Sequence, residues 1–391
     1  MKKMLVISQL PIWDIQKNSG KEVMNRTFHA FSAVYDLEII APGAEVSFRN
    51  SKFYKVNNRI QKRLGTIKYL GHLYNYLYVI IFYLKVKRII KKNNIKPDVV
   101  YLIGYWSSFV GYKIFKNSAV IVNRYYGVAW NEDKFNTIRE RLKFLIKNYC
   151  YKHFGDFAIM TNDGTKGDKF LEKIGYSKEK IFFLKNGIET SFEVDHQLKT
   201  SFLEKHKIPE NSLLFLTVSR LASWKRVEKA ILLIAELNKI YENVYLIIVG
   251  DGEERHNLEN LAKKTGIDEN VIFTGAVSRE KLPTYYDLAE FFLSFYEFSN
   301  AGNPLFEAML HGKCIITLNN GDTGKFIDDQ SAVLLDEENQ ETILERTLEI
   351  MNNSTRKKKI SQDAKKTLRK NFQSWNERIN YEIDLIEKFS K

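Results

Sequence analysis

Short apolar segments recur along the whole of this 391-residue chain, and stretches with helical spacing of apolar residues separate them. In the first half they cover residues 3–8, 37–41, 99–103, 119–122, 157–160 and 181–184, and in the second half residues 213–218, 244–249, 271–273, 291–294, 314–317 and 332–335. Strands that are apolar on both faces are typical of a parallel sheet with helices on either side. The sequence therefore predicts an α/β chain with two doubly wound, Rossmann-like sheets.

A polar stretch separates the two halves. Between Ile188 and Asn211 the apolar residues are scattered, and Pro209 stands near its end. Such a stretch is typical of a linker. We therefore predict an N-terminal domain at residues 1–190 and a second domain at residues 191–374, followed by an amphipathic helix within residues 375–391.

The composition excludes several classes of protein. Charged residues make up 27% of the chain and apolar residues 44%, which rules out a disordered or collagen-like chain. Cys150 and Cys314 are far apart and belong to no CxxC motif, so neither a disulfide framework nor a cysteine zinc site is expected. The longest uncharged run, residues 69–84, is too short to span a bilayer, and the first residues do not resemble a signal peptide. We expect a cytoplasmic location.

The positive charge is concentrated in the first half. The net charge is +13, and residues 1–190 hold 33 Lys and Arg against 15 Asp and Glu. Between Val46 and Lys96 there are thirteen basic residues and no acidic one, interleaved with aromatic residues. The structural interpretation is a long helix with solvated lysines, but such a surface can also bind anionic lipids, so we expect peripheral contact with the inner face of the cell membrane. Because no helix-turn-helix, zinc-finger or RNP pattern is present, no nucleic-acid partner is expected.

Candidate ligand-binding residues follow the strands of the second half, because ligands of open parallel sheets bind beyond the carboxyl ends of the strands. After the strand at residues 213–218, Arg220 and Lys225 precede a helix, where two cations can hold a diphosphate. The next strand ends at Gly250–Asp251–Gly252. This turn lacks the third glycine and the ribose-binding acid of a dinucleotide fingerprint, which argues against a nicotinamide site.

The most informative segment runs from Tyr296 to Gly312. A strand leads into a loop rich in Gly and Asn, Pro304 stands in the first helical turn and Gly312 ends the helix. Glu307, one turn into this helix, can accept hydrogen bonds from two vicinal hydroxyls such as those of a ribose. The structural alternative for Glu307 is a favourable interaction with the helix dipole.

Together these motifs resemble the second domain of family 4 glycosyltransferases. These enzymes have the GT-B fold, in which two Rossmann-like domains face a central cleft, and they transfer sugars from sugar nucleotides with retention and without a metal. The resemblance also implies that the last helix returns to the first domain. The match follows the family's order and spacing at Arg220, Lys225, Gly250–Gly252, Phe273–Gly275, Gly302–Met309 and Gly312–Lys313. Asn186–Glu189 resembles the family's turn before the linker, and the first domain matches more loosely at Ser19–Gly20 and Pro97–Val100.

The resemblance implies a role for each matching residue. Arg220 and Lys225 would neutralise the donor diphosphate and stabilise the departing nucleotide, and Glu307 would hold its ribose. In the family the donor phosphate takes the acceptor proton during front-face attack, so neither a metal nor a cofactor is expected. The other implied donor-binding residues are Ser19, Gly20, Gly250, Gly275, Ala276, Val277, Ser299, Asn300, Ala301, Gly302, Asn303, Pro304 and Leu305.

Two positions depart from the family pattern. The family has a first glutamate eight residues before the second, where this chain has Ser299, and we predict that Glu297 replaces it. The counterpart of the family histidine near the donor sugar is Tyr126. The resemblance thus implies a hexosyltransferase that moves a sugar from a nucleoside diphosphate to a hydroxyl of a glycan or lipid-linked acceptor in cell-surface polysaccharide or glycoconjugate assembly. The departures leave open a catalytically silent sugar-nucleotide-binding or partner subunit, and a sugar-nucleotide epimerase or a phosphorylase is a further alternative.

Overall fold

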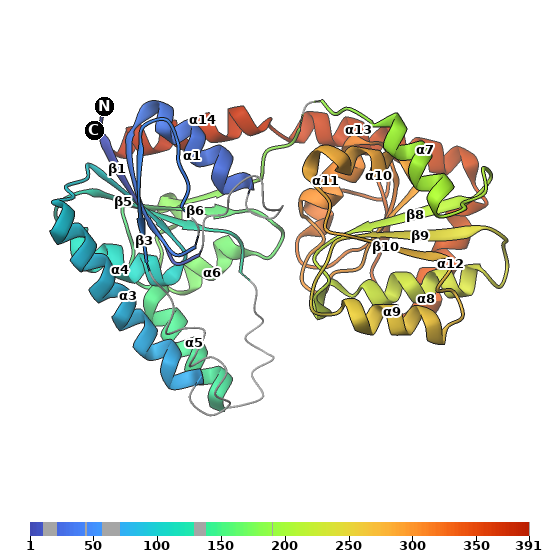
Figure 1. The fold of residues 1–391 in the computed structure, drawn as a ribbon, viewed down its shortest axis with the longest axis horizontal. Helices are drawn as coiled ribbons and strands as arrows, with labels where there is room; N and C mark the ends of the chain where they lie inside the picture. Colours follow the sequence, from blue (N-terminus) through green and yellow to red (C-terminus); the bar gives the residue numbers. More distant parts are fainter. Residues whose placement is uncertain (11–21, 44, 57–70, 129–137, 190, 391) are drawn as a thin grey trace. The chain divides into compact units, whose positions relative to one another are not determined.

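The computed structural model describes residues 1–10, 22–43, 45–56, 71–128, 138–189 and 191–390. The chain divides into two compact units (Figure 1). Unit 1 comprises Met1–Asn162, Lys166–Leu184 and Arg378–Lys391, and unit 2 comprises Asp163–Thr165 and Lys185–Glu377. Each unit contains a parallel sheet with helices on both faces, so the predicted fold class is confirmed.

The sheet of unit 1 has seven strands in the order β3-β2-β1-β4-β5-β6-β7. Six of them coincide with the predicted segments to within three residues at either end. Strand β3 was not predicted, because it lies at the edge of the sheet, is half-exposed and carries two lysines in five residues. The bounds are Lys3–Ser8 (β1), Asp36–Ala41 (β2), Ser51–Lys55 (β3), Val99–Ile103 (β4), Val120–Tyr125 (β5), Phe157–Thr161 (β6) and Ile181–Leu184 (β7).

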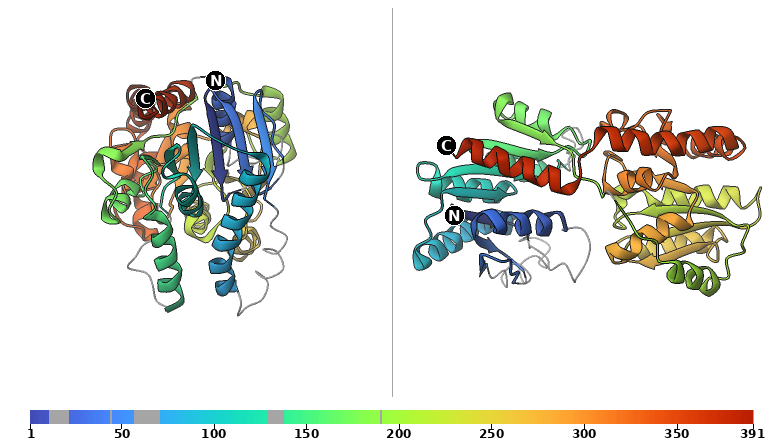
Figure 2. Two further views of the ribbon diagram at one scale, coloured as in Figure 1. Left: turned by 90° about the vertical axis from the view of Figure 1, so that its left-hand side faces the viewer. Right: turned by 90° about the horizontal axis from the view of Figure 1, so that it is seen from above.

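Helices cover both faces of this sheet, with α1 and α14 on one face and α3, α4, α5 and α6 on the other (Figures 1 and 2). Phe28 and Phe31 of α1 and Ile386 of α14 are fully buried against it. None of the helices among the described residues is long and apolar enough to cross a membrane. The bounds are Glu22–Val34 (α1), Gly71–Asn93 (α3), Tyr105–Phe115 (α4), Ile138–Tyr151 (α5), Gly167–Lys173 (α6) and Trp375–Phe389 (α14).

A buried ionic cluster fixes α14 to the sheet of unit 1. Glu382 of α14 accepts hydrogen bonds from Arg378 Nη1 at 2.7 Å and from the hydroxyl of Tyr101, and Arg124 Nε lies 3.9 Å from its carboxylate. Burial opposes the charged form of Glu382, but the two guanidinium groups and the Tyr101 hydroxyl outweigh it and lower the pKa of this carboxyl. The predicted return of the last helix to the first sheet is therefore confirmed from Arg378 onward.

The sheet of unit 2 has six strands in the order β10-β9-β8-β11-β12-β13, and all six were predicted. Helices α8, α9 and α12 cover one face, and α7, α10, α11 and α13 cover the other (Figure 1). The strands are Leu213–Val218 (β8), Val244–Val249 (β9), Val271–Gly275 (β10), Phe291–Ser294 (β11), Cys314–Leu318 (β12) and Val333–Leu335 (β13). The helices are His196–Lys205 (α7), Val227–Leu237 (α8), Arg255–Lys264 (α9), Leu282–Leu288 (α10), Asn303–Leu310 (α11), Gln340–Met351 (α12) and Ser354–Asn371 (α13).

The polar stretch between Ile188 and Asn211 contains α7, which packs on α10. Phe202 of α7 contacts Tyr285 with ring centres 5.5 Å apart, and Lys199 Nζ lies 2.7 Å from a carboxylate oxygen of Asp287. In the structure this stretch belongs to unit 2, whose second segment begins at Lys185.

Candidate functional site

Arg220 and Lys225 lie in the loop that joins β8 to α8. The side chain of Arg220 is exposed. Lys225 is the last residue of a 3-10 turn, Ser223–Lys225, and its half-buried side chain packs against two aromatic rings. Its Nζ lies 4.1 Å from the centre of the Trp224 ring and 3.4 Å from that of Tyr296. Burial and repulsion by Arg220 lower the pKa of Lys225 to about 7, against the opposing effect of Asp163. Lys225 therefore changes charge near neutral pH. An anion bound beside it would stabilise its protonated form.

The glycine turn after β9 brings three strand ends together. Gly250 has a φ of 139°, and a Cβ there would lie 1.8 Å from the carbonyl oxygen of Ser219, so only glycine fits. The Gly250 N–H donates a hydrogen bond to the carbonyl of Gly275 at 2.9 Å. The loops after β8, β9 and β10 therefore lie side by side, with the exposed Ala276 and the half-buried Val277 following Gly275.

The loop between β11 and α11 is organised around Asn300, which is fully buried. Its Oδ1 accepts hydrogen bonds from Ser294 Oγ at 2.6 Å and from the Tyr296 N–H at 2.9 Å. Its Nδ2 donates to the carbonyl of Leu318 at 3.2 Å, and its N–H donates to Thr323 Oγ1 at 3.0 Å. These bonds occupy Asn300 within the protein, so the structure supports a role for it in holding the loop, and donor binding by Asn300 stays a prediction.

Ser299 connects the same loop to Asp163–Thr165, a segment distant in sequence. Ser299 Oγ donates to the Asp163 carbonyl at 2.8 Å and accepts from the Ala301 N–H at 3.1 Å. The Asp163 carboxylate accepts two hydrogen bonds from Thr165, at 3.1 Å from its N–H and 2.6 Å from its hydroxyl. Burial raises the pKa of Asp163, and both Thr165 and Lys225 oppose this effect. In the sequence, Asp163 followed by Gly164 is typical of a turn, and nothing there points to this electrostatic coupling with Lys225.

Glu297 lies in the loop beside Lys225. Its N–H donates to the carbonyl of Trp224 at 2.9 Å, and its own carbonyl accepts from Asn320 Nδ2 at 3.0 Å. The Trp224 ring packs against Tyr296 and Phe298, with ring centres 6.2 and 6.1 Å apart, which favours a packing role for this tryptophan. The backbone thus holds Glu297 next to the Trp224–Lys225 turn.

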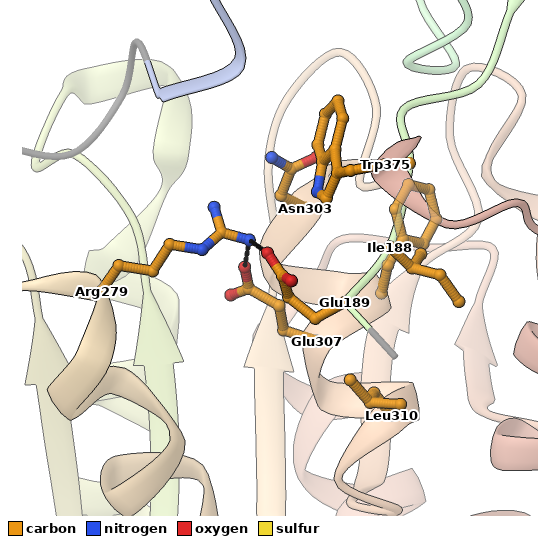
Figure 3. Close-up of a pocket in the computed structure, with 9 residues that line it drawn as sticks. Ile188, Glu189, Arg279, Asn303, Glu307, Leu310 and Trp375 are labelled. Carbon is orange, nitrogen blue, oxygen red and sulfur yellow. Dashed lines mark hydrogen bonds and ion pairs between the residues drawn. The ribbon is translucent and has the colours of Figure 1, made fainter. Parts of the chain in front are cut away.

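Glu307 projects from α11 into a pocket of unit 2 (Figure 3). The Tyr286 hydroxyl donates to Glu307 Oε2 at 3.1 Å, and Arg279 Nη2 lies 3.8 Å from Glu307 Oε1. The same guanidinium nitrogen lies 2.6 Å from Glu189 Oε1. Ile188, Asn303 and Trp375 also line this pocket, and Asn186 Nδ2 donates to Asn303 Oδ1 at 2.9 Å. The Asn186–Glu189 turn and the start of α11, both singled out in the sequence, therefore meet here.

The remaining predicted site residues have different surroundings. Leu305 is buried in the core of unit 2, and Gly302 is the N-cap residue of α11, with Pro304 in the first turn. Tyr126 belongs to unit 1, where its ring lies 4.0 Å from Arg124 Cζ. Ser19 and Gly20 lie outside the described residues. Within the described ranges, no group of three or more His, Cys, Asp or Glu could hold a metal ion.

A family model and several curated proteins match this chain. Residues 199–367 match the model described as glycosyl transferases group 1. An uncharacterized glycosyltransferase of Methanocaldococcus jannaschii is 28% identical over 240 residues, which are 60% of this chain and 58% of that protein. The alpha-monoglucosyldiacylglycerol synthase of Streptococcus pneumoniae is 25% identical over 138 residues, 35% of this chain and 31% of that enzyme. A GDP-mannose-dependent alpha-(1-6)-phosphatidylinositol monomannoside mannosyltransferase of Mycobacterium tuberculosis is 25% identical over 167 residues, 38% of this chain and 43% of that enzyme.

Solved structures match over almost the entire chain, whereas the matched stretches span between about a third and three fifths of these curated relatives. A glycosyltransferase from Rickettsia africae superposes with a TM-score of 0.71 at 18% identity, covering 100% of this chain and 99% of that one. An Anabaena protein solved in complex with UDP and glucose superposes with a TM-score of 0.71 at 15% identity, covering 99% and 100%. At these identities the superpositions show the fold. Residues 199–367 therefore match the glycosyl transferases group 1 family, and the chain has the GT-B fold.

Proposed function

We propose that the chain is a retaining, metal-independent glycosyltransferase that moves a sugar from a nucleoside diphosphate to a hydroxyl of a glycan or lipid-linked acceptor. The observation that carries this proposal is that unit 2 holds two neighbouring cations, Arg220 and Lys225, in the loop after β8, and a carboxylate, Glu307, one turn into α11. The first two suit a diphosphate and the third suits a ribose. The names of the relatives support it, since one depends on GDP-mannose and one structural neighbour was solved with UDP and glucose.

In the proposed reaction the positive charges act on the leaving nucleotide. When the bond between the sugar and the diphosphate breaks, negative charge grows on the phosphate oxygens, and Arg220 and protonated Lys225 stabilise it. Burial destabilises the ammonium form of Lys225 in the free protein. A bound diphosphate would raise the pKa of this lysine, and the fully protonated ammonium group would then stabilise the diphosphate. The acceptor proton passes to the departing phosphate, so the chain needs no separate base.

Two residues stand in for those at which this chain departs from the family pattern: Glu297 for the glutamate whose position holds Ser299, and Tyr126 for the histidine. We assign Glu297 to the donor sugar, because hydrogen bonds from its backbone fix it beside the Trp224–Lys225 turn. The conservative variant Glu297→Gln tests this assignment: turnover should fall by about tenfold or more if the carboxylate meets the sugar. Near-normal turnover would remove Glu297 from the site. Tyr126→Phe tests the phenol in the same way and retains the ring over Arg124.

We further propose that the acceptor is bound to a membrane and that unit 1 contacts anionic lipids. Ile80 and Leu84 of α3 are more than half exposed and lie one helical turn apart. The exposed Lys87 and Lys91 continue this stripe at helical spacing. No acidic residue occurs between Val46 and Lys96, so the stripe suits a negatively charged surface.

Helix α5 carries a similar stripe. Leu145 and Tyr149 lie within the helix, and Lys152 directly follows its last residue. Helix α4 connects the two, since the ring of Phe109 contacts Tyr83 of α3 at 6.4 Å and Tyr149 of α5 at 6.0 Å between ring centres. These exposed apolar and basic side chains support peripheral contact with the inner face of a membrane, where acceptors for cell-surface polysaccharide or glycoconjugate assembly are found.

A transfer assay tests the proposed function. The protein is incubated with UDP-, GDP- and ADP-sugars labelled in the sugar, with extracted membrane lipids and with a chelator of divalent metals. We expect the label to reach the lipid fraction from one donor, with the anomeric configuration of that donor in the product. Conversion of the donor without an acceptor would indicate an epimerase, and a requirement for phosphate would indicate a phosphorylase. Donor binding without transfer to any acceptor would indicate a silent subunit.

A further inference from the structure

One guanidinium nitrogen of Arg279 faces two carboxylates that come from distant segments of unit 2 (Figure 3). Its Nη2 is 2.6 Å from Glu189 Oε1 and 3.8 Å from Glu307 Oε1. The side chains of Arg279, Glu189 and Glu307 are 25%, 30% and 19% exposed, so all three are largely withdrawn from water. One guanidinium group therefore faces two carboxylates and is held much closer to Glu189.

The distances from Arg279 to the two carboxylates are unequal, and this difference determines how strongly Arg279 occupies Glu307. A guanidinium group that meets a single carboxylate commonly forms two parallel hydrogen bonds, and the carboxylate oxygens are then occupied by a strong partner. Here the bond to Glu189 leaves a long ion contact between Arg279 and Glu307. The hydroxyl of Tyr286, on α10, shares its one proton between the other oxygen of Glu307, at 3.1 Å, and the carbonyl of Pro304, at 2.9 Å.

We propose that Glu189 is a positioning residue that holds Arg279 away from Glu307, so that the ribose hydroxyls of the nucleotide compete with a long ion contact rather than with a bidentate pair. This inference rests on the proposed function, in which Glu307 binds the ribose. It gives the last residue of the Asn186–Glu189 turn a role in nucleotide affinity without direct contact with the nucleotide.

Two nucleotide series test this inference. UDP, GDP and ADP and their 2′,3′-dideoxy forms are titrated into the full chain by calorimetry. With wild-type protein, the diphosphate that binds should bind about tenfold or more tightly with both hydroxyls than without them, because a carboxylate accepts their hydrogen bonds. In Glu189→Gln, Arg279 should pair with Glu307, and this ratio should fall to about threefold or less.

Variants of Arg279 separate competition from a general structural effect. Arg279→Ala should keep the wild-type ratio, because the competing cation is gone. The double variant Glu189→Gln/Arg279→Ala should regain the ratio that Glu189→Gln loses. Glu290→Gln is the matched control, because it removes a carboxylate that pairs with Lys357 at the same distance of 2.6 Å outside this pocket, and it should leave the ratio unchanged.

The outcomes distinguish the two proposals. If wild-type protein binds ribo and dideoxy forms equally, or binds no diphosphate, the ribose assignment of Glu307 fails and this inference fails with it. If wild-type protein discriminates but Glu189→Gln discriminates equally well, only the positioning role of Glu189 is overturned. Glu189→Gln could also lose its preference for the ribo form without the double variant regaining it. That result would overturn the positioning role of Glu189 as well, because the loss of preference would then not act through Arg279.

Discussion

The ammonium nitrogen of Lys225 lies 3.4 Å from the centre of the Tyr296 ring. The contact joins the loop after β8 to the loop after β11, and it places the cation of one candidate motif against the backbone segment that carries Glu297. An aromatic face attracts a cation, but it also replaces the water that would stabilise the charge. In this site the loss of water outweighs the attraction of the rings. The neutral amine is therefore more stable, relative to the ammonium form, than it is in water, as the lowered pKa of Lys225 indicates.

Diphosphate binding should therefore depend on pH. Lys225 has a pKa of about 7 in the free protein, so it is largely protonated below neutral pH and loses its proton as the pH rises. Because the anion binds to the protonated form, the dissociation constant should rise above pH 7 by up to about tenfold per pH unit. Calorimetric titration at a series of pH values measures this dependence.

The variant Lys225→Arg is its control, because a guanidinium group stays charged throughout this range. The affinity of this variant should be nearly constant between pH 7 and pH 9. An identical pH dependence in the variant and the wild type would show that another group titrates.

Asn300 should contribute more to stability than to nucleotide contact. Asn300→Ala leaves the buried partners Ser294 Oγ and the Tyr296 N–H without their acceptor, and we expect a loss of about 2–3 kcal/mol in the free energy of unfolding. Urea unfolding followed by circular dichroism measures it. Asn319→Ala is the matched control, since Asn319 is exposed and bonds Asp336 at 2.8 Å, and its effect should stay below about 0.5 kcal/mol. Equal losses in the two variants would contradict the structural role of Asn300.

Glu382 should stabilise unit 1 in a pH-dependent manner. Glu382→Gln leaves Arg124 and Arg378 buried with a neutral partner, and we expect a loss of about 3 kcal/mol at neutral pH. Because the folded pKa of Glu382 is lowered, its contribution is present above the ordinary carboxyl pKa of about 4 and disappears as the pH falls through the folded value. Unfolding measured at several pH values should show the gap between wild type and variant closing in acid.

The exposed Asp384 of the same helix provides the control for this prediction. Asp384→Asn removes a carboxylate from the same helix at an exposed position, and it should change the free energy of unfolding by less than about 0.5 kcal/mol. A gap between wild type and Glu382→Gln that is independent of pH would contradict a charged Glu382.

The apolar stripe on α3 should bind vesicles. Ile80→Asp/Leu84→Asp adds negative charge and removes two exposed apolar side chains, and binding to vesicles that contain phosphatidylglycerol should fall by about tenfold or more. Co-sedimentation measures the bound fraction. Ile240→Asp, at an equally exposed isoleucine of unit 2, should bind as the wild type does. Equal binding to vesicles of phosphatidylcholine alone would contradict the role of the basic residues.

Buried strands could be predicted from the sequence because an apolar run on both faces leaves few alternatives. The half-exposed edge strand β3 has no such run and was missed. The turn at Gly250 and the helix start at Pro304 could be predicted, because backbone geometry and helix position restrict the residue types at those points. The ribose-binding role of Glu307 stays a prediction. Arg279 was not singled out, since it begins a 3-10 turn that carries no motif and only the fold brings it to Glu189 and Glu307.

Asp163 shows the same limit. Its position after β6 indicates a turn, and its coupling to Lys225 depends on the docking of Asp163–Thr165 against Ser299. Side chains that act through contacts between distant segments leave no local pattern, so the sequence could predict the strand ends of the site but not the network that holds them.

Calorimetric titration of UDP, GDP and ADP in the presence of a chelator measures whether Arg220 and Lys225 bind a nucleoside diphosphate. We predict that one of these diphosphates binds wild-type protein and that Arg220→Ala/Lys225→Ala binds it about a hundredfold more weakly, because two charge-assisted contacts are lost. Arg226→Ala/Lys229→Ala removes two neighbouring cations and should bind normally. Absence of binding by all three diphosphates, or equal affinity for the Arg220/Lys225 variant and the wild type, would show that these two residues form no diphosphate site.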